Sequence, residues 1–99
     1  MHDYLPKVQT TVADDGALLG FICMRGTAVA GLFVHPRVQN TGVGSALLNS
    51  QDAQSLEVLE ANLPARAFYA KHGFAQTGQR VHDRIGLMLC CLTRAPISS

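Results

Sequence analysis

Charged side chains are scarce in this sequence. Only 15% of its 99 residues are Asp, Glu, Lys or Arg, and the formal net charge is +1. The basic residues form no patch, so the composition gives no sign of nucleic-acid binding. Hydrophobic residues make up 47% of the chain, which excludes a disordered chain and predicts a single domain over 1–99, with a lead-in at 1–6 and a tail at 95–99. A small protein with so little surface charge can hide apolar surface by pairing, so we expect a homodimer.

Long apolar runs and a regular set of cysteines are also absent. No run approaches the length needed to span a bilayer, and the polar residues 1–4 are not followed by the apolar segment of a signal peptide. Cys23, Cys90 and Cys91 are the three cysteines, and they give neither a disulfide framework nor a metal-ligand spacing. We expect them to be small core residues in a cytoplasmic protein that has no membrane contact and requires no metal.

The first third of the chain has the pattern of three strands joined by short turns. Residues 7–13, 17–25 and 27–34 are rich in β-branched and apolar residues. An Asp-Gly pair ending at Gly16 separates the first two strands, and Gly26 separates the second from the third. Strands linked this closely predict an antiparallel meander.

The hydrophobic period changes after the third strand. Pro36 cannot donate to a ladder and ends that strand. Val43, Ala46 and Leu47 then recur at the spacing of one helical face. The pattern predicts a helix from residue 41 or 42 to about residue 49.

The second half of the chain is expected to supply three more strands and a second helix. Residues 56–59 predict a strand that runs parallel to the third strand, because a helix connects the two in a right-handed crossover. A proline suits the first turn of a helix over 65–71, and Gly73 is expected to end that helix as a left-handed cap. Residues 74–81 and 85–93 predict the last two strands.

The turn between the third strand and the first helix has the chemistry of a phosphate site. Gly42 and Gly44 let a pyrophosphate approach the main chain without meeting a Cβ. The first N–H groups of a helix lack internal partners and lie at the positive end of its dipole, and Ser45 adds a hydroxyl donor. A nucleotide P-loop would need a lysine after Gly44, and a dinucleotide fingerprint would need a glycine where Leu47 stands, so neither pattern fits.

The pattern that does fit is Gln39-x-x-Gly42-x-Gly44. It resembles the coenzyme A pyrophosphate loop of the GCN5-related N-acetyltransferase (GNAT) family, whose motif reads Gln/Arg-x-x-Gly-x-Gly/Ala. Residues 60–74 resemble the family's other signature, in which Asn, Ala, Phe-Tyr and Gly-Phe follow at fixed offsets. The two motifs occur in the family's order, and with their flanking strands the resemblance covers residues 17 to about 80.

This resemblance implies an α/β, GNAT-like fold: a mixed, mostly antiparallel sheet with at least two helices, lacking the family's usual N-terminal strand and helices. It implies direct transfer of an acetyl group from acetyl-coenzyme A to a primary amine. In the family two parallel strands splay apart beyond a bulge, and the pantetheine arm enters between them. The cofactor-binding residues implied here are Phe33, Val34, Gln39, Asn40, Thr41, Gly42, Val43, Gly44, Ser45, Asn62, Phe68 and Tyr69.

The residues implied for catalysis each have a structural alternative. Tyr69 is expected to give a proton to the departing thiolate; alternatively it packs as an aromatic beside Phe68, although neighbouring helix positions should not face the same way. Asn62 either holds the pantetheine or a water, or caps the helix. Glu57 and Glu60 are candidates for the base that deprotonates the amine, or else solvated glutamates at the end of a strand.

The acceptor half looks reduced in comparison with the family. Residue 8 already lies in what corresponds to the family's second strand, and the loop at 81–84 is short. Either the chain is a shortened member or a partner subunit supplies the missing wall. The alternative function is therefore a non-catalytic coenzyme A-binding or dimeric interaction protein, and nucleotide-binding regulation is a third class.

Overall fold

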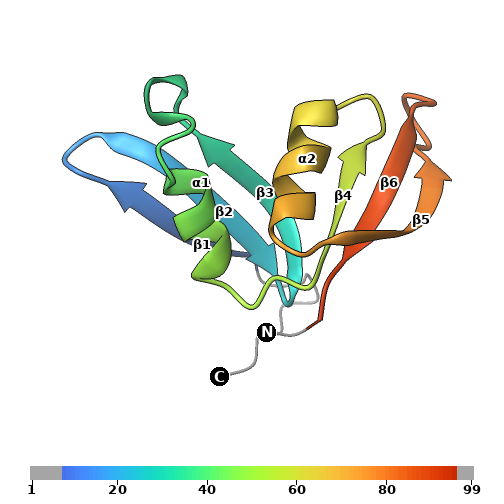
Figure 1. The fold of residues 1–99 in the computed structure, drawn as a ribbon, viewed down its shortest axis with the longest axis horizontal. Helices are drawn as coiled ribbons and strands as arrows, with labels where there is room; N and C mark the ends of the chain where they lie inside the picture. The colour runs from blue at the N-terminus through green and yellow to red at the C-terminus, as the bar shows by residue number, and fades with distance from the viewer. Residues whose placement is uncertain (1–7, 96–99) are drawn as a thin grey trace, which may run out of the picture. The chain divides into compact units, whose positions relative to one another are not determined.

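The computed structural model describes residues 8–95, which fall in two compact units that divide after Ala53. Figure 1 labels the strands and helices of each unit. The lead-in expected at 1–6 lies outside the described residues, as does all of the tail except Ala95. The single domain over 1–99 stays a prediction.

The first unit contains the predicted antiparallel meander. Its strands are β1 (Val8–Asp14), β2 (Leu18–Arg25) and β3 (Ala28–Val34), and β2 pairs antiparallel with both neighbours. The two hairpin turns depend on glycine, because Gly16 has a φ of 102° and Gly26 has a φ of 63°, and both values lie in the left-handed region. These strands were therefore predicted to within a residue at each end.

The first helix, α1 (Val43–Asn49), follows a short 3₁₀ turn, η1 (Pro36–Val38), and packs on the meander. The helix itself was predicted, but its buried face was partly wrong. Ala46 is exposed, whereas Leu47 and Leu48 are 4% and 0% exposed. The apolar spacing of the sequence allows either Ala46 or Leu48 to lie on the buried face beside Leu47. The docking of the helix on the sheet buries Leu48.

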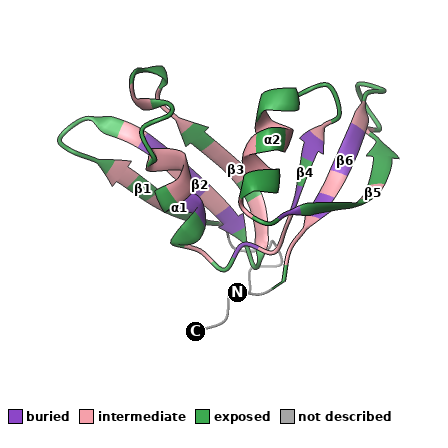
Figure 2. Ribbon diagram, viewed as in Figure 1, coloured by how far each residue is buried: buried purple, intermediate pink, exposed green. Residues whose placement is uncertain are grey.

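The second unit has a sheet in the order β4-β6-β5, with β6 antiparallel to both neighbours. Figure 2 shows its buried residues concentrated on β4 and β6, while β5 is exposed almost throughout. One face of this sheet carries the buried side chains of Leu56, Val58, Cys90 and Leu92. The four elements of the unit are β4 (Ser55–Leu59), α2 (Leu63–Lys71), β5 (Ala75–Val81) and β6 (Met88–Thr93).

Helix α2 has defined hydrogen bonds at both ends. At its start the side chain of Asn62 accepts a hydrogen bond from the Ala65 N–H at 3.3 Å, and a proline occupies the first turn. At its end the Gly73 N–H donates to the Ala70 carbonyl and the Phe74 N–H donates to the Tyr69 carbonyl, both at 3.1 Å. This is a Schellman turn, and it requires the left-handed φ of 88° at Gly73. The predicted glycine cap is confirmed, although the helix begins two residues earlier than predicted.

The start of the last strand was predicted wrongly. It begins at Met88 rather than at residue 85, because residues 82–87 form a hairpin loop. The His82 Nδ1 accepts hydrogen bonds from the N–H groups of Arg84 at 3.2 Å and Ile85 at 3.4 Å, and Gly86 turns left-handed with a φ of 67°. Apolar composition alone could not show that these amides bond to a histidine side chain instead of a ladder.

The parallel pairing of β3 with β4, and any splay between these strands, would join the two units. This expectation stays a prediction.

Within residues 8–95, no helix is both long enough and apolar enough to cross a membrane.

The close approach of β3, and next of α1, to β2 requires a glycine at position 20. A Cβ built on Gly20 would lie 2.5 Å from the Phe33 carbonyl oxygen and 3.2 Å from the Leu47 Cδ1. We predict that Gly20→Ala lowers the free energy of unfolding by about 1–3 kcal/mol, the usual cost of overpacking. Urea unfolding measures the change. The matched control is Gly31→Ala, whose new Cβ meets nothing within 4 Å; equal losses in both variants would show that the crowding around the Gly20 position is not the cause.

Candidate active site

The loop between β3 and α1 is held in place by hydrogen bonds from its own residues. The His35 N–H donates to the Leu19 carbonyl at 2.7 Å, and the His35 Nδ1 accepts from the Arg37 N–H at 3.1 Å. The side-chain amide of Gln39 donates to the Val34 carbonyl at 3.3 Å. The glutamine of the first motif therefore ties the loop back to the end of β3.

The chain then turns sharply into the helix. Asn40 has a φ of 66° and Gly42 a φ of 96°, so two left-handed residues flank Thr41, whose hydroxyl donates to the Val38 carbonyl. The first helical bond runs from the Ala46 N–H to the Gly42 carbonyl at 2.9 Å. The N–H groups at 42–44 precede this bond in the first turn of α1, which is the arrangement that can bind an anion.

The residues predicted to receive the pantetheine arm lie at the end of β3. Phe33 is 39% exposed, and its ring stacks on Phe21 with the centroids 5.5 Å apart; Val34 is half-buried. The register between β2 and β3 shifts so that Ala30 has no partner. This places a bulge in β3 shortly before Phe33 and Val34.

The side chain of Tyr69 lies in an aromatic cluster on α2. Its ring centroid is 5.2 Å from that of Phe68 and 5.7 Å from that of Phe74, both edge to face. The expectation that Phe68 and Tyr69 would face apart is therefore wrong, because neighbouring rings on a helix are wide enough to meet. Burial raises the pKa of the Tyr69 phenol, so the phenol keeps its proton at neutral pH.

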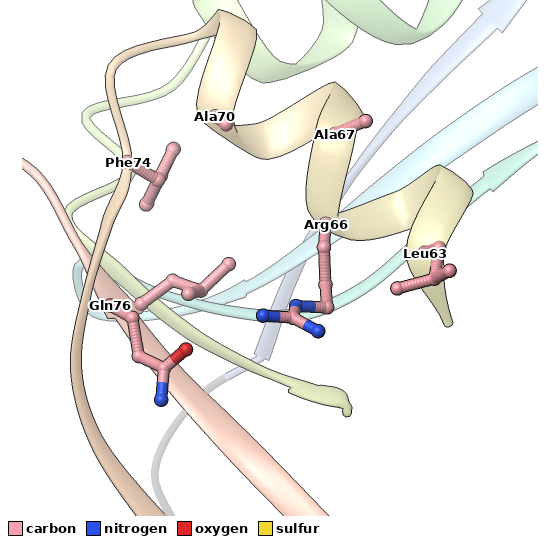
Figure 3. Close-up of a pocket in the computed structure, with 7 residues that line it drawn as sticks. Leu63, Arg66, Ala67, Ala70, Phe74 and Gln76 are labelled. Atoms are coloured by element: carbon pink, nitrogen blue, oxygen red, sulfur yellow. The ribbon is translucent and has the colours of Figure 1, made fainter. Parts of the chain in front are cut away.

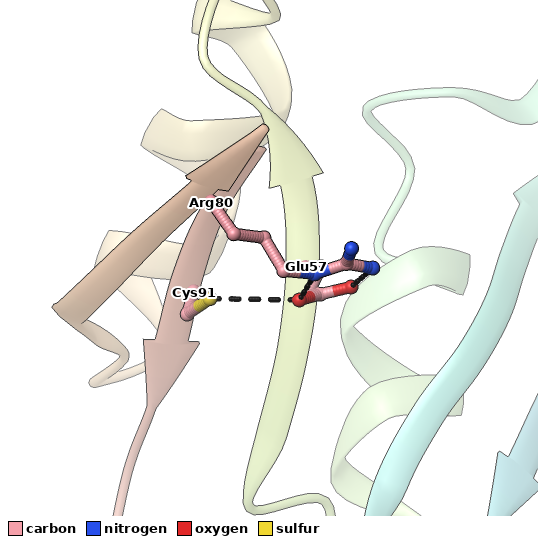
Figure 4. Close-up of polar contacts among 3 residues, drawn as sticks. All are labelled: Glu57, Arg80 and Cys91. Carbon is pink, nitrogen blue, oxygen red and sulfur yellow. Dashed lines mark hydrogen bonds and ion pairs between the residues drawn. The ribbon is translucent and has the colours of Figure 1, made fainter. Parts of the chain in front are cut away.

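Glu57 is held in an ion pair (Figure 4). The Arg80 guanidinium donates to both carboxylate oxygens, at 2.5 and 2.7 Å, and the Cys91 thiol lies 3.5 Å from one of them. The Arg80 hydrogen bond holds the pKa of the Glu57 carboxyl below its ordinary value. Burial, and next the hydrogen bond to Glu57, raise the pKa of Cys91, so this thiol is poorly suited to act as a nucleophile.

The two candidate bases occupy opposite faces of the second unit's sheet. Glu57 pairs across the sheet with Cys91, whereas the next residue, Leu92, lines the space beneath α2, and successive side chains of a strand point to opposite faces. The carboxylate of Glu60 accepts from the Gln79 side chain at 3.2 Å, and its carbonyl accepts from Arg66 of α2 at 3.0 Å. Of the two glutamates, Glu60 is the one whose main chain is hydrogen-bonded to α2, the helix that carries Tyr69.

A cavity of about 380 Å³ lies between α2 and the strands β5 and β6 (Figure 3). Most of its lining is apolar, and the side chains of Arg66 and Gln76 supply its polar groups. No pattern in the sequence indicated it, because the lining alternates between a helix and two strands. The lining residues are Leu63, Arg66, Ala67, Ala70, Phe74, Gln76 and Leu92.

Sequence reasoning missed two arginines. Arg80 of β5 reaches Glu57 of β4 across β6. The register between β5 and β6 shifts between Gln76 and Gly78, so counting residues along the two strands does not give the correct pairs. Arg94 follows β6 and lies in no motif, yet it contacts the turn at the end of α2. Only the pairing of distant strands could have revealed either one.

Comparison with known proteins identifies the family and the fold of this chain. The model of the acetyltransferase (GNAT) domain matches residues 6–76, and the chain therefore belongs to the GNAT acetyltransferase family. Its strands and helices are those of the GNAT fold, since the solution structure of apo-form YjaB from Escherichia coli matches with a TM-score of 0.73 at 28% identity, covering 87% of this chain and 63% of that one.

Two curated relatives are peptidyl-lysine N-acetyltransferases. YiaC of Escherichia coli (strain K12) is 39% identical over 77 residues, which are 72% of this chain and 53% of YiaC. YjaB of Salmonella typhimurium (strain LT2) is 33% identical over 92 residues, which are 87% of this chain and 63% of YjaB. The chain thus spans between half and two thirds of the length of these relatives.

The Glu57–Arg80 pair should make stability depend on pH. A carboxyl whose folded-state pKa is lowered stabilises the fold above its ordinary pKa, and this contribution is lost as the pH falls through the lowered value. We predict that Glu57→Gln is less stable than the wild type at pH 7, and that the difference disappears in acid and shrinks in high salt. Urea midpoints between pH 7 and pH 2 measure it. Glu60→Gln, which loses only a contact with a neutral amide, is the control, and an equal loss there would contradict the assignment.

Proposed function

We propose that the protein is an acetyl-coenzyme A-dependent N-acetyltransferase that passes the acetyl group directly to a primary amine. The observation that supports this most is the loop at 39–45, where two left-handed residues, Asn40 and Gly42, lead into the first turn of α1. That loop carries the family's motif, and the family model covers it. The names of the relatives favour the side-chain amine of a lysine in a peptide as the acceptor.

The cofactor would be held mainly by main-chain groups. The diphosphate would accept hydrogen bonds from the N–H groups at 42–44, and the exposed Arg37 guanidinium would add positive charge. The pantetheine arm would run along Phe33 and Val34, with Phe68 and Tyr69 near the thioester. Asn62 already caps α2 through its side-chain oxygen, so its amide NH₂ is the group left to contact the arm. The remaining contacts would come from Gln39, Asn40, Thr41, Val43, Gly44 and Ser45.

The chemistry needs two protons removed from the nitrogen and one supplied to the sulfur. The ammonium loses its first proton to a base, and the free amine then attacks the thioester carbon. As the C–S bond breaks and the neutral amide forms, the nitrogen loses its second proton to water or to the Tyr69 phenolate. Tyr69 would give its proton to the departing sulfur, yielding coenzyme A with a free thiol. We propose Glu60 as the base, acting through water, in preference to Glu57, because the Glu57 carboxylate is paired with Arg80 and is a weaker proton acceptor.

Homodimer formation would suit the exposed apolar side chains of the β5–β6 hairpin. Val81, Ile85 and Leu87 are each more than half exposed. The same hairpin carries Asp83 beside Arg84, so a second copy related by a two-fold axis could place opposite charges together around the apolar contact. We propose a second copy of the chain as the occupant of this hairpin patch (Val81, Ile85 and Leu87).

The test for pairing is light scattering after size-exclusion chromatography. We predict that Ile85→Ser combined with Leu87→Ser converts a dimer into a monomer. Val12→Ser, which removes an equally exposed apolar side chain from β1, should leave the mass unchanged. A wild-type monomer at high concentration would refute the proposed patch.

The test for catalysis is Tyr69→Phe. Removal of the hydroxyl should lower kcat by about 10²–10⁴, the usual contribution of a general acid, while the affinity for coenzyme A, measured by calorimetry, changes little. Release of free thiol from acetyl-coenzyme A in the presence of a lysine peptide measures kcat. Phe68→Leu, which removes the neighbouring ring and keeps the Tyr69 hydroxyl, reports on ring packing and on the proposed contact of Phe68 near the thioester.

The same two measurements separate the alternatives. Tight binding of coenzyme A without turnover against any amine would favour the non-catalytic binder. Stronger binding of ATP or NAD than of coenzyme A would favour nucleotide-binding regulation. An unchanged kcat in Tyr69→Phe would remove Tyr69 as the acid without affecting the cofactor site.

A further inference from the structure

Arg94 lies just after β6 and is held there by the main chain. Its N–H donates to the Gln54 carbonyl at 2.9 Å, immediately before β4. The residue is half-buried, and its side chain extends toward the turn that ends α2. Its position is therefore fixed by the ends of two strands rather than by a free loop.

The guanidinium makes two contacts with that turn. The Arg94 Nη1 donates to the His72 carbonyl at 2.9 Å, and the guanidinium carbon lies 4.6 Å from the centre of the Phe74 ring. A cation at the carboxyl end of a helix is favoured by the helix dipole, and a guanidinium over an aromatic face gains a cation–π attraction. Both contacts therefore stabilise the turn at 72–74 in its observed conformation.

The same turn determines where the Tyr69 ring lies. Phe74 donates its N–H to the Tyr69 carbonyl at 3.1 Å, and its ring meets the Tyr69 ring edge to face with the centroids 5.7 Å apart. Phe74 is only 5% exposed, so it leaves Tyr69 little room to rotate on that side. A continuous series of contacts thus runs from Arg94 through Phe74 to Tyr69.

We infer that Arg94 is a positioning residue for Tyr69: by clamping His72 and Phe74 it fixes the ring that carries the proposed acid. The inference rests on the role proposed for Tyr69. Proton transfer within an assembled site is steeply sensitive to position, because a misplacement of about 1 Å can cost on the order of a hundredfold in rate. A side chain that never touches the substrate can therefore govern the rate.

A purely structural role for Arg94 predicts something different. Loss of an arginine that only stabilises the fold would lower the unfolding midpoint and leave kcat per folded molecule, the pH profile and the ring contacts unchanged. Loss of a positioning residue changes kcat and the surroundings of Tyr69 in molecules that are still folded. The two roles are therefore separable whichever amine serves as the acceptor.

The variants are Arg94→Met, which keeps length but removes charge and donors, and Arg94→Lys, which keeps the charge. Arg25→Met is the matched control, because Arg25 is exposed at the end of β2 and lies in neither proposed site. We expect Arg94→Met to lower kcat about tenfold with little change in KM, which is less than the loss that a misplacement of about 1 Å can cause. Arg94→Lys should recover part of the lost kcat. Arg25→Met should match the wild type.

NMR supplies a readout that needs no turnover. Contacts between the Tyr69 and Phe74 rings should weaken in Arg94→Met. The pKa of His72, lowered by burial and next by the charges of Arg94 and Lys71, should rise in Arg94→Met and stay low in Arg94→Lys. These shifts show whether the clamp exists in solution.

The outcomes keep the two proposals apart. If folded Arg94→Met retains the wild-type ring contacts and kcat, the inference about Arg94 is overturned while the acetyltransferase stands. If the wild type shows no turnover with any amine, the proposed function fails, and weakened ring contacts in Arg94→Met would still establish the clamp on Tyr69.

Discussion

The structure depends on two left-handed glycines, each placed immediately outside a helix. Gly42 precedes α1 with a φ of 96°, and Gly73 follows α2 with a φ of 88°. A residue with a Cβ meets a steric penalty in this region, so each site restricts where its helix can begin or end. The first glycine exposes main-chain donors at the start of α1, and the second folds Phe74 back against Tyr69. Both groups proposed for function therefore depend on main-chain geometry more than on any charged side chain.

These two glycines also explain which parts of the molecule were predictable. The positions of Gly42 and Gly73 relative to the apolar period are local signals, and they correctly located α1 and the end of α2. Gly16 and Gly26 likewise located the hairpins of the meander, and Asn62 makes the helix cap that was one of its two predicted roles. The start of β6 was not predictable, because His82 binds two amides of the preceding loop through its side chain. The Glu57–Arg80 pair and the Arg94 clamp were missed because each joins segments that are far apart in sequence. Spacing within one segment carries no information about such contacts.

The placement of the two glutamates shows how a structure narrows a chemical assignment. From sequence they were equivalent, being three residues apart at the end of one strand. Glu57 accepts from Arg80 and Glu60 accepts from Gln79, and Gln79 and Arg80, which are successive residues of β5, point to opposite faces. Arg80 also lowers the proton affinity of Glu57. A base must be able to take up a proton near neutral pH, and a carboxylate already bonded twice to a guanidinium is poorly suited to that. Glu60, bonded only to a neutral amide, keeps a lone pair available.

The pKa of Tyr69 shifts in the opposite direction to that of Glu57, because burial raises it. An acid must keep its proton until the transition state, and desolvation disfavours the phenolate, which raises the pKa of Tyr69. The same burial would make a free phenolate costly after the proton has left, so the proton must be recovered quickly from the amine side or from water. A ring packed against Phe68 and Phe74 is thus both structural and suited to catalysis. The two interpretations of Tyr69 are therefore compatible, because the packing that holds the ring also keeps the phenol protonated until the thiolate departs.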